Sequence, residues 1–177
     1  REGYIEFKDG IWKNTGAINT PVLDSVLDIL TIISNPIDET IWAGSYGGGL
    51  IQKKENQLQI FKQNSPLEAA VGDPGNFRIS GLVLDNQQNL WISNYGAPKP
   101  LKVLSKNNEW AGFTPPVTLL ENAVAQIVSD DENNQLWIQS PKGNGLLLYH
   151  YGNNILSAAD DRWKLFKQGA GNGNLPS

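Results

Sequence analysis

The sequence predicts an all-β fold made of repeated four-stranded antiparallel sheets. Its six tryptophans fall into two sets. Members of the first set follow an aliphatic residue in strand-like segments and lie 49 and 46 residues apart, and members of the second follow polar turns. The two sets are Trp42, Trp91 and Trp137, and Trp12, Trp110 and Trp163. A repeat of this length with several short strands is typical of a β-propeller, so each repeat is interpreted as a blade.

The clearest blade spans residues 76–114. Apolar residues dominate 78–85, as expected for an inner strand that is buried on both faces. Polar turns then separate this strand from segments at 90–95, 101–104 and 110–113, which are rich in β-forming residues. These four segments predict one antiparallel blade.

The same pattern recurs on both sides of this blade. The remaining parts are the outer two strands of a partial blade over 1–15, blades over 22–64 and 122–168, and a linker toward the next blade over 169–177. Leu58 takes the place of the second-set tryptophan, because 58–63 aligns with 163–168 without a gap. All of these parts are assigned to one propeller domain.

About three and a half blades leave apolar faces uncovered, because a four-stranded blade needs a neighbour on each face. We therefore expect this chain to be half of a seven-bladed propeller. The rest of a longer propeller or a second copy of the chain would then close the ring. The opening residues lack signal-peptide features and an initiator Met, so the chain is expected to be an excised or mature piece.

The composition excludes several functional classes. The net charge is -4 with a pI near 4.9, so there is no basic surface field for nucleic acid. The chain has no cysteine and one histidine, which excludes thiol catalysis and multi-histidine metal centres. No run of 18 apolar residues is present.

Local motifs favour structural roles over chemistry. The acidic turns at 85–89 and 130–134 contain oxygen ligands for calcium, but their spacing matches no EF-hand and suits tight hairpins. The glycines of 44–49 precede a strand, whereas a phosphate-binding loop precedes a helix, so they predict a bulged connection. His150 is interpreted as a hairpin residue. We predict no catalytic, cofactor-binding or metal-binding residue.

The tryptophans of the first set could stack on sugars. Their recurrence at one position of every blade instead favours a repeated core contact. Irregular loops at 68–76, 96–100 and 141–145 break the repeat, and such loops can line a binding face. The candidate binding residues in or beside the loops are Tyr46, Asp73, Tyr95, Lys99, Lys142 and Asn144.

Several segments carry a resemblance to known families. The stretch 82–93 and the strand-and-glycine element 42–50 resemble the blades of two-component regulator propellers. More specific segments are similar to the propeller region of PorZ-like proteins, which are surface components of the type IX secretion system of Bacteroidetes. These segments are 64–67, 94–104, 142–146, and 160–164 leading into 171–177.

The PorZ-like resemblance implies a longer parent with a signal peptide, two propellers and a sorting domain. It also implies work at the outer membrane, on the cell surface or in the periplasm, with protein partners of an attachment complex that includes the sortase. Contact with lipopolysaccharide or another glycan is a further implication. The matched motifs belong to the scaffold, so they assign no binding residue.

The predicted function is a non-enzymatic interaction scaffold. The alternative is the periplasmic ligand-sensing propeller of a hybrid two-component sensor kinase. A sorting domain at the end of the parent would support the first, and a kinase the second. A weaker third hypothesis, a lyase or glycosidase, requires paired carboxylates, or Tyr with His, at the mouth of the ring.

Overall fold

The structure is a computed structural model that describes residues 3–169, 173 and 175. The described residues form fourteen β-strands and two short 3-10 helices. The strands are β1 (Tyr4–Lys8), β2 (Ile11–Thr15), β3 (Ile29–Ser34), β4 (Ile41–Gly47), β5 (Gly49–Lys54), β6 (Gln57–Phe61), β7 (Phe77–Leu84), β8 (Leu90–Asn94), β9 (Leu101–Leu104), β10 (Trp110–Phe113), β11 (Ile127–Asp130), β12 (Gln135–Ser140), β13 (Gly145–His150) and β14 (Arg162–Phe166). The helices are η1 (Pro21–Ser25) and η2 (Leu120–Asn122), and neither is long enough to cross a membrane. Most of the predicted 169–177 linker lies outside the described residues.

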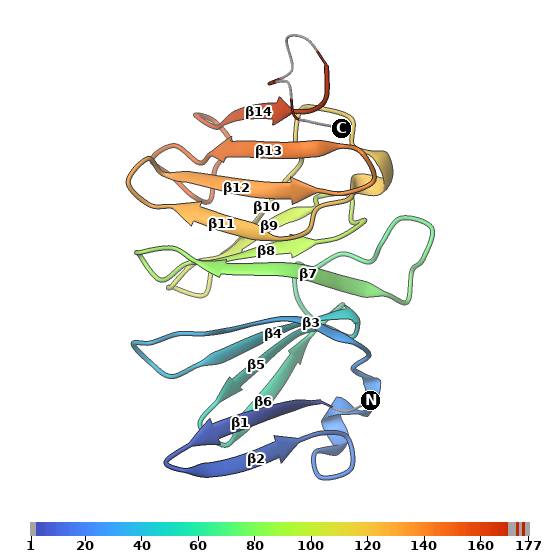
Figure 1. Cartoon of the computed structure of the whole chain (residues 1–177), viewed down its shortest axis with the longest axis vertical. Helices are drawn as coiled ribbons and strands as arrows, with labels where there is room; N and C mark the ends of the chain where they lie inside the picture. The colour runs from blue at the N-terminus through green and yellow to red at the C-terminus, as the bar shows by residue number, and fades with distance from the viewer. Residues whose placement is uncertain (1–2, 170–172, 174, 176–177) are drawn as a thin grey trace.

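The strands form a hairpin, β1–β2, and three full sheets. The first sheet is β3–β6, the second is β7–β10 and the third is β11–β14, and every pairing between consecutive strands within them is antiparallel. The sheets are stacked along the long axis of the molecule, from the hairpin at one end to the third sheet at the other (Figure 1). This arrangement confirms the predicted all-β fold with a partial propeller architecture.

Both faces of the second sheet are covered. All five residues of β8 are buried, and they alternate between two clusters. Leu90 and Ile92 pack with Trp42 and Leu50 of the first sheet, whereas Trp91 packs with Tyr149 of the third. Because successive side chains of β8 point to opposite faces, this one strand packs against both neighbouring sheets.

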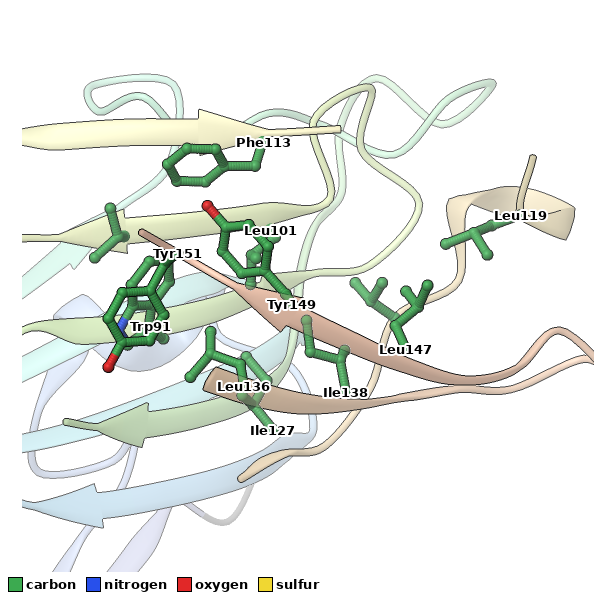
Figure 2. Close-up of a cluster of buried hydrophobic side chains, with 12 residues drawn as sticks. Trp91, Leu101, Phe113, Leu119, Ile127, Leu136, Ile138, Leu147, Tyr149 and Tyr151 are labelled. Atoms are coloured by element: carbon green, nitrogen blue, oxygen red, sulfur yellow. The ribbon is translucent and has the colours of Figure 1, made fainter. Parts of the chain in front are cut away.

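The larger cluster lies between the second and third sheets, where side chains from both point toward one another (Figure 2). Trp91 is fully buried, with ring centroids 6.1 Å from Phe113, 5.8 Å from Tyr149 and 5.0 Å from Tyr151. Tilted and edge-on aromatic pairs at these separations are favourable beyond the apolar area that they bury. This tryptophan contacts three aromatic rings within the cluster between the second and third sheets.

The two tryptophan sets occupy equivalent positions, as the sequence predicts. The first set lies on the second strand of each full sheet, and the second set lies on the last strand. Leu58 takes the same place in β6, three residues before a phenylalanine that faces the start of β5. Trp137 is nevertheless only half-buried, because no described element covers its face of the third sheet, so the predicted core contact reduces to Phe166.

The inner strand of the third sheet, β11, begins at Ile127, although Val124 and Ala125 of the predicted 122–168 blade are also apolar. The residues just before β11 stay bonded to β12, because the carbonyl of Gln139 accepts from the amide of Ala125 and the amide of Gln139 donates to the carbonyl of Gln126. Ser80 on β7 also donates its hydroxyl to the carbonyl of Val124. This segment therefore contacts the second sheet as well as its own.

The turn between β7 and β8 is built on one buried carboxylate. Asp85 Oδ1 accepts hydrogen bonds from the amides of Gln87 and Asn89, both at 2.9 Å. Its Oδ2 accepts from Asn89 Nδ2 at 2.9 Å and from Trp91 Nε1 at 3.1 Å. Both oxygens are occupied by the hairpin, which supports the turn interpretation over calcium binding for this segment.

We predict that Asp85→Ala lowers the free energy of unfolding by about 2–4 kcal/mol, because it leaves the Trp91 indole and the Asn89 amide buried without acceptors. Asp130→Ala in the third sheet is the matched control. Asp130 accepts only from the side chain of Asn133, an exposed contact, so its removal costs less than about 1 kcal/mol. Urea denaturation of both variants measures the difference, and equal losses would contradict the prediction.

Candidate functional site

One edge of the stacked sheets gathers the irregular connections and is called the loop face. Because the sheets are antiparallel, the ends of even-numbered strands and the starts of odd-numbered strands meet there. The connections on the loop face are 16–28, Gly48, 62–76, 95–100, 114–126 and 141–144. The opposite edge carries shorter turns and one longer connection, 151–161.

Two sheets meet on the loop face through a short piece of backbone pairing. Tyr46 at the end of β4 lies opposite Arg78 at the start of β7. The guanidinium carbon of Arg78 lies 4.9 Å from the centre of the Tyr46 ring, a cation–π contact. Arg78 Nη2 also donates to Asp73 Oδ2 at 2.5 Å. The arginine therefore links an aromatic side chain of one sheet to the 62–76 loop.

The chain of contacts continues toward the third sheet. The rings of Tyr46 and Tyr95 lie 5.8 Å apart, and the Tyr95 hydroxyl donates to Glu121 Oε2 at 3.4 Å. Glu121 Oε1 lies 3.4 Å from Lys142 Nζ. The six residues form one continuous series, called the loop-face row: Asp73, Arg78, Tyr46, Tyr95, Glu121 and Lys142.

The row is electrically balanced, and the pKa values of Asp73 and Tyr95 are shifted by their surroundings. Hydrogen bonds from Asn76 and Arg78 lower the pKa of Asp73 below its usual value. Burial, followed by the proximity of Tyr46 and Glu121, raises the pKa of Tyr95, so its hydroxyl stays protonated and can donate. The row thus presents two carboxylates, two cations and two aromatic rings on one surface.

Asn144 holds the backbone beside the row. Its Oδ1 accepts from the amide of Leu120 at 2.7 Å, and its Nδ2 donates to the carbonyls of Leu120 and Pro141. Asn122 links the same helix to the second sheet, because it donates Nδ2 to the carbonyl of Ala97. These amides place Glu121 between Tyr95 and Lys142.

Lys99 lies apart from the row, in a second cluster with Glu68 and Lys102. Glu68 Oε2 accepts from Lys102 Nζ at 2.5 Å and from the amide of Lys99 at 3.1 Å. Lys102 is almost fully buried, and burial lowers its pKa although Glu68 opposes that effect. Lysine is seldom buried without a charged partner, and here the 62–76 loop covers this face and supplies the counter-charge through Glu68.

His150 and Tyr149 have side chains of types that can act in catalysis, but both make contacts that hold the local structure. His150 Nδ1 accepts from the amide of Gly152 at 3.2 Å, at the end of β13. The Tyr149 hydroxyl donates to Asp161 Oδ2 at 2.6 Å, and its ring stacks on Trp163 at 4.0 Å. Burial raises the pKa of Tyr149 far above its usual range, so this phenol does not act as a base near neutral pH.

The third strands of the first and third sheets, β5 and β13, each begin with a glycine for a steric reason. A Cβ atom at Gly49 would lie 2.2 Å from the carbonyl oxygen of Phe61, and one at Gly145 would lie 2.1 Å from that of Phe166. Both residues also have positive φ angles, of 80° and 109°. These contacts assign the two glycines to the close approach of neighbouring strands. Among the described residues, no group of three or more His, Cys, Asp or Glu could hold a metal ion.

The structure brings together four of the six candidate binding residues, Tyr46, Asp73, Tyr95 and Lys142, places Asn144 beside them and leaves Lys99 apart. Their role in binding stays a prediction. Sequence reasoning missed Arg78 and Glu121, which complete the row. Arg78 is the second residue of a strand and Glu121 lies in a short helix, so neither belongs to the irregular loops singled out from the sequence.

Comparison with solved structures adds a likeness in fold. PorZ of the human oral bacterium Porphyromonas gingivalis, an essential surface component of its type IX secretion system, superposes with a TM-score of 0.71. The chain shares its fold with PorZ. The match has 20% identity and covers 92% of this chain but 24% of PorZ, so the chain spans about a quarter of that protein. At this identity the likeness shows the fold alone.

No protein-family model and no curated protein sequence matches the chain. The likeness to PorZ therefore rests on the three-dimensional arrangement of the sheets. It agrees with the resemblance that the sequence segments carry.

We predict that Asn76→Ala raises the pKa of Asp73 toward the usual value near 3.9, and that Arg78→Ala also raises it. Because the pKa is lower in the folded state, the stability that this carboxylate contributes is fully present above about pH 3.9. It is lost as the pH falls through the folded-state pKa. Carboxyl-carbon NMR titration measures the shift, and Lys54→Ala, at the opposite edge, is the control that leaves it unchanged.

Proposed function

We propose that the chain is part of a non-enzymatic β-propeller scaffold of a type IX secretion system, acting at the outer-membrane surface. The observation that carries this proposal is the match to PorZ over 92% of the chain. The scaffold presents its loops to protein partners of an attachment complex, among them the sortase that anchors cargo. A glycan of the cell surface is a further candidate ligand.

The loop-face row is the proposed protein-binding surface. Tyrosine and arginine are enriched among the residues that dominate binding energy at protein interfaces. Exposed apolar side chains flank the row: Val71 bonds through its amide to Gly96, and Leu120 lies beside Asn144. An apolar patch crossed by paired charges suits a protein partner that places charges of opposite sign against them.

The contacts among the row residues also support the scaffold role. Each ionic side chain of the row has a partner within the row, and these contacts fix loops from all three sheets. A surface held in this way is preorganised, so a partner spends little free energy on ordering it. This supports binding to a protein partner.

Further blades or a second copy would cover the two ends of the stack. At one end, Ile5, Phe7 and Trp12 of the hairpin are exposed on one face, with the Phe7 and Trp12 rings 4.6 Å apart. At the other end, Val128 and Trp137 lie opposite each other on the uncovered face of the third sheet. Both faces resemble the buried faces between the sheets, so we propose that similar sheets pack on them.

We expect Tyr46→Ala and Lys142→Glu to weaken binding of the full-length protein to the sortase of the same organism by at least about tenfold each. Lys106→Glu is the matched control, because it reverses a lysine in the β9–β10 turn at the opposite edge. Biolayer interferometry with purified proteins measures the affinities. Equal effects of all three variants would remove the row from the interface.

The whole proposal is tested in the organism that encodes the chain. Deletion of the parent gene should leave secreted cargo unanchored, and the full-length protein should reappear at the surface on complementation. Normal anchoring of cargo together with a lost transcriptional response to an external ligand would overturn the proposal in favour of the sensor hypothesis.

A further inference from the structure

The outer perimeter of the second sheet carries a groove along its last strand, β10. The groove has a volume of about 440 Å³. Its floor is the strand itself. The 62–76 loop forms one wall, and the β13–β14 connection forms the other. Two lysines lie at one end of the groove. Its lining comprises Pro66, Glu68, Lys99, Lys102, Trp110, Ala111, Gly112, Phe113, Leu156 and Ala158.

The floor of the groove is an open strand edge. Ser105 donates its amide to the carbonyl of Glu109, so these two residues form a hydrogen-bonded pair at the start of the β9–β10 ladder. Bonded and non-bonded pairs alternate along an antiparallel ladder. Ala111 therefore bonds to β9, whereas the backbone groups of Trp110 and Gly112 point away from it. These groups are free to pair with another extended chain.

One wall is an insertion that the other sheets lack. The third and fourth strands are joined by 55–56 in the first sheet and by 105–109 in the second, but by 151–161 in the third. Within this longer connection, Ile155 and Leu156 pack against the cluster around Trp91. The amide of Asn153 bonds to Asp160 Oδ2 at 2.9 Å. The wall is thus anchored in the core.

The charge in the groove is positive, in a chain whose net charge is -4. Glu68 is neutralised by Lys102 at 2.5 Å. The Lys99 ammonium, which is exposed, has no ion-pair partner within the described residues. A Cβ atom at Gly112 would lie 3.0 Å from Lys102 Cδ and 3.3 Å from Lys99 Cδ, so both lysine stems lie over this glycine. One unpaired cation therefore stands beside the open edge.

We propose that this groove binds an extended acidic peptide segment of a partner protein, which adds to the second sheet as a strand beside β10. The peptide backbone pairs with Trp110 and Gly112, and a carboxylate of the peptide pairs with Lys99. Apolar side chains on the opposite face of the peptide contact Ala111 and Leu156, which lie on the other face of β10 from Gly112. Strand addition of this kind takes affinity from the main chain and specificity from alternate side chains.

This inference is independent of the loop-face row, because the groove lies on the perimeter and shares no residue with it. An oligosaccharide or a small anion would use the lysine but not the alternating backbone groups. The open edge, the anchored wall and the unpaired cation together favour a peptide. The experiments distinguish these ligands.

Binding is measured by fluorescence anisotropy with the whole chain. The probe is a labelled peptide, Thr-Val-Glu-Val-Asp-Val, with two comparison peptides. One has lysine in place of both acids, and the other has N-methyl groups on alternate backbone nitrogens. The acidic probe should bind, and both comparison peptides should lose at least about tenfold in affinity, through charge and through lost backbone pairing.

The contribution of Lys99 is tested by charge reversal. Lys99→Glu should weaken binding of the acidic peptide by about tenfold at low salt, with less effect at high salt. Lys106→Glu is the matched control, since it gives the same change of net charge in the same sheet, outside the groove. It should alter the affinity by less than about twofold. Equal losses in both variants would overturn the assignment to this groove.

Hydrogen exchange followed by NMR reports strand addition directly. The amides of Trp110 and Gly112 should exchange more slowly when the acidic peptide is bound, whereas the amide of Ala111, already bonded to β9, should not change. Peptide binding without this alternation would overturn the proposal. So would the absence of binding at about 1 mM peptide, or binding of an oligogalacturonate, but not of the peptide, that Lys99→Glu abolishes.

Discussion

Each full sheet is apolar on both faces, and this constraint determines the rest of the structure. In β8 the side chains of Leu90 and Ile92 enter one cluster while Trp91 enters the other, so the second sheet cannot bury its apolar area against a single neighbour. Here neighbouring sheets stacked on either side cover both faces. The stacking also aligns the strand ends of successive sheets, which is why loops distant in the sequence meet along one edge.

The two candidate interaction surfaces use the aligned sheets differently. The loop-face row joins residues of three sheets, and its geometry depends on the stacking; Arg78 contacts Tyr46 only because β4 and β7 pair at their ends. The groove beside β10 depends instead on what departs from the repeat, namely the longer connection at 151–161. The loop-face row follows from the regular stacking of the sheets, and the groove follows from a connection that is longer than its equivalents in the other sheets.

Much of the fold could be predicted because strand identity is local. The segments 101–104 and 110–113 coincide with β9 and β10, since turns rich in Asn, Lys and Pro bound short runs of β-forming residues. Burial of Lys102 could not be predicted, because its partner, Glu68, is brought by a loop from another sheet. Trp137 has the same local pattern as Trp91, yet its exposure depends on whether a further sheet covers it. The row escaped prediction because Arg78 meets Tyr46, and Glu121 meets Tyr95 and Lys142, only where successive sheets come together.

The backbone pairing of Tyr46 and Gly47 with Arg78 and Phe77 makes the first two full sheets one continuous hydrogen-bonded network. The third sheet has no strand pairing with the second and is held mainly by the side chains around Trp91. Directional bonds resist shear, whereas an apolar contact lets two surfaces slide or separate as units. Under a pulling force the molecule would therefore divide between β7–β10 and β11–β14, and the two parts would differ in mechanical strength although they share one repeat.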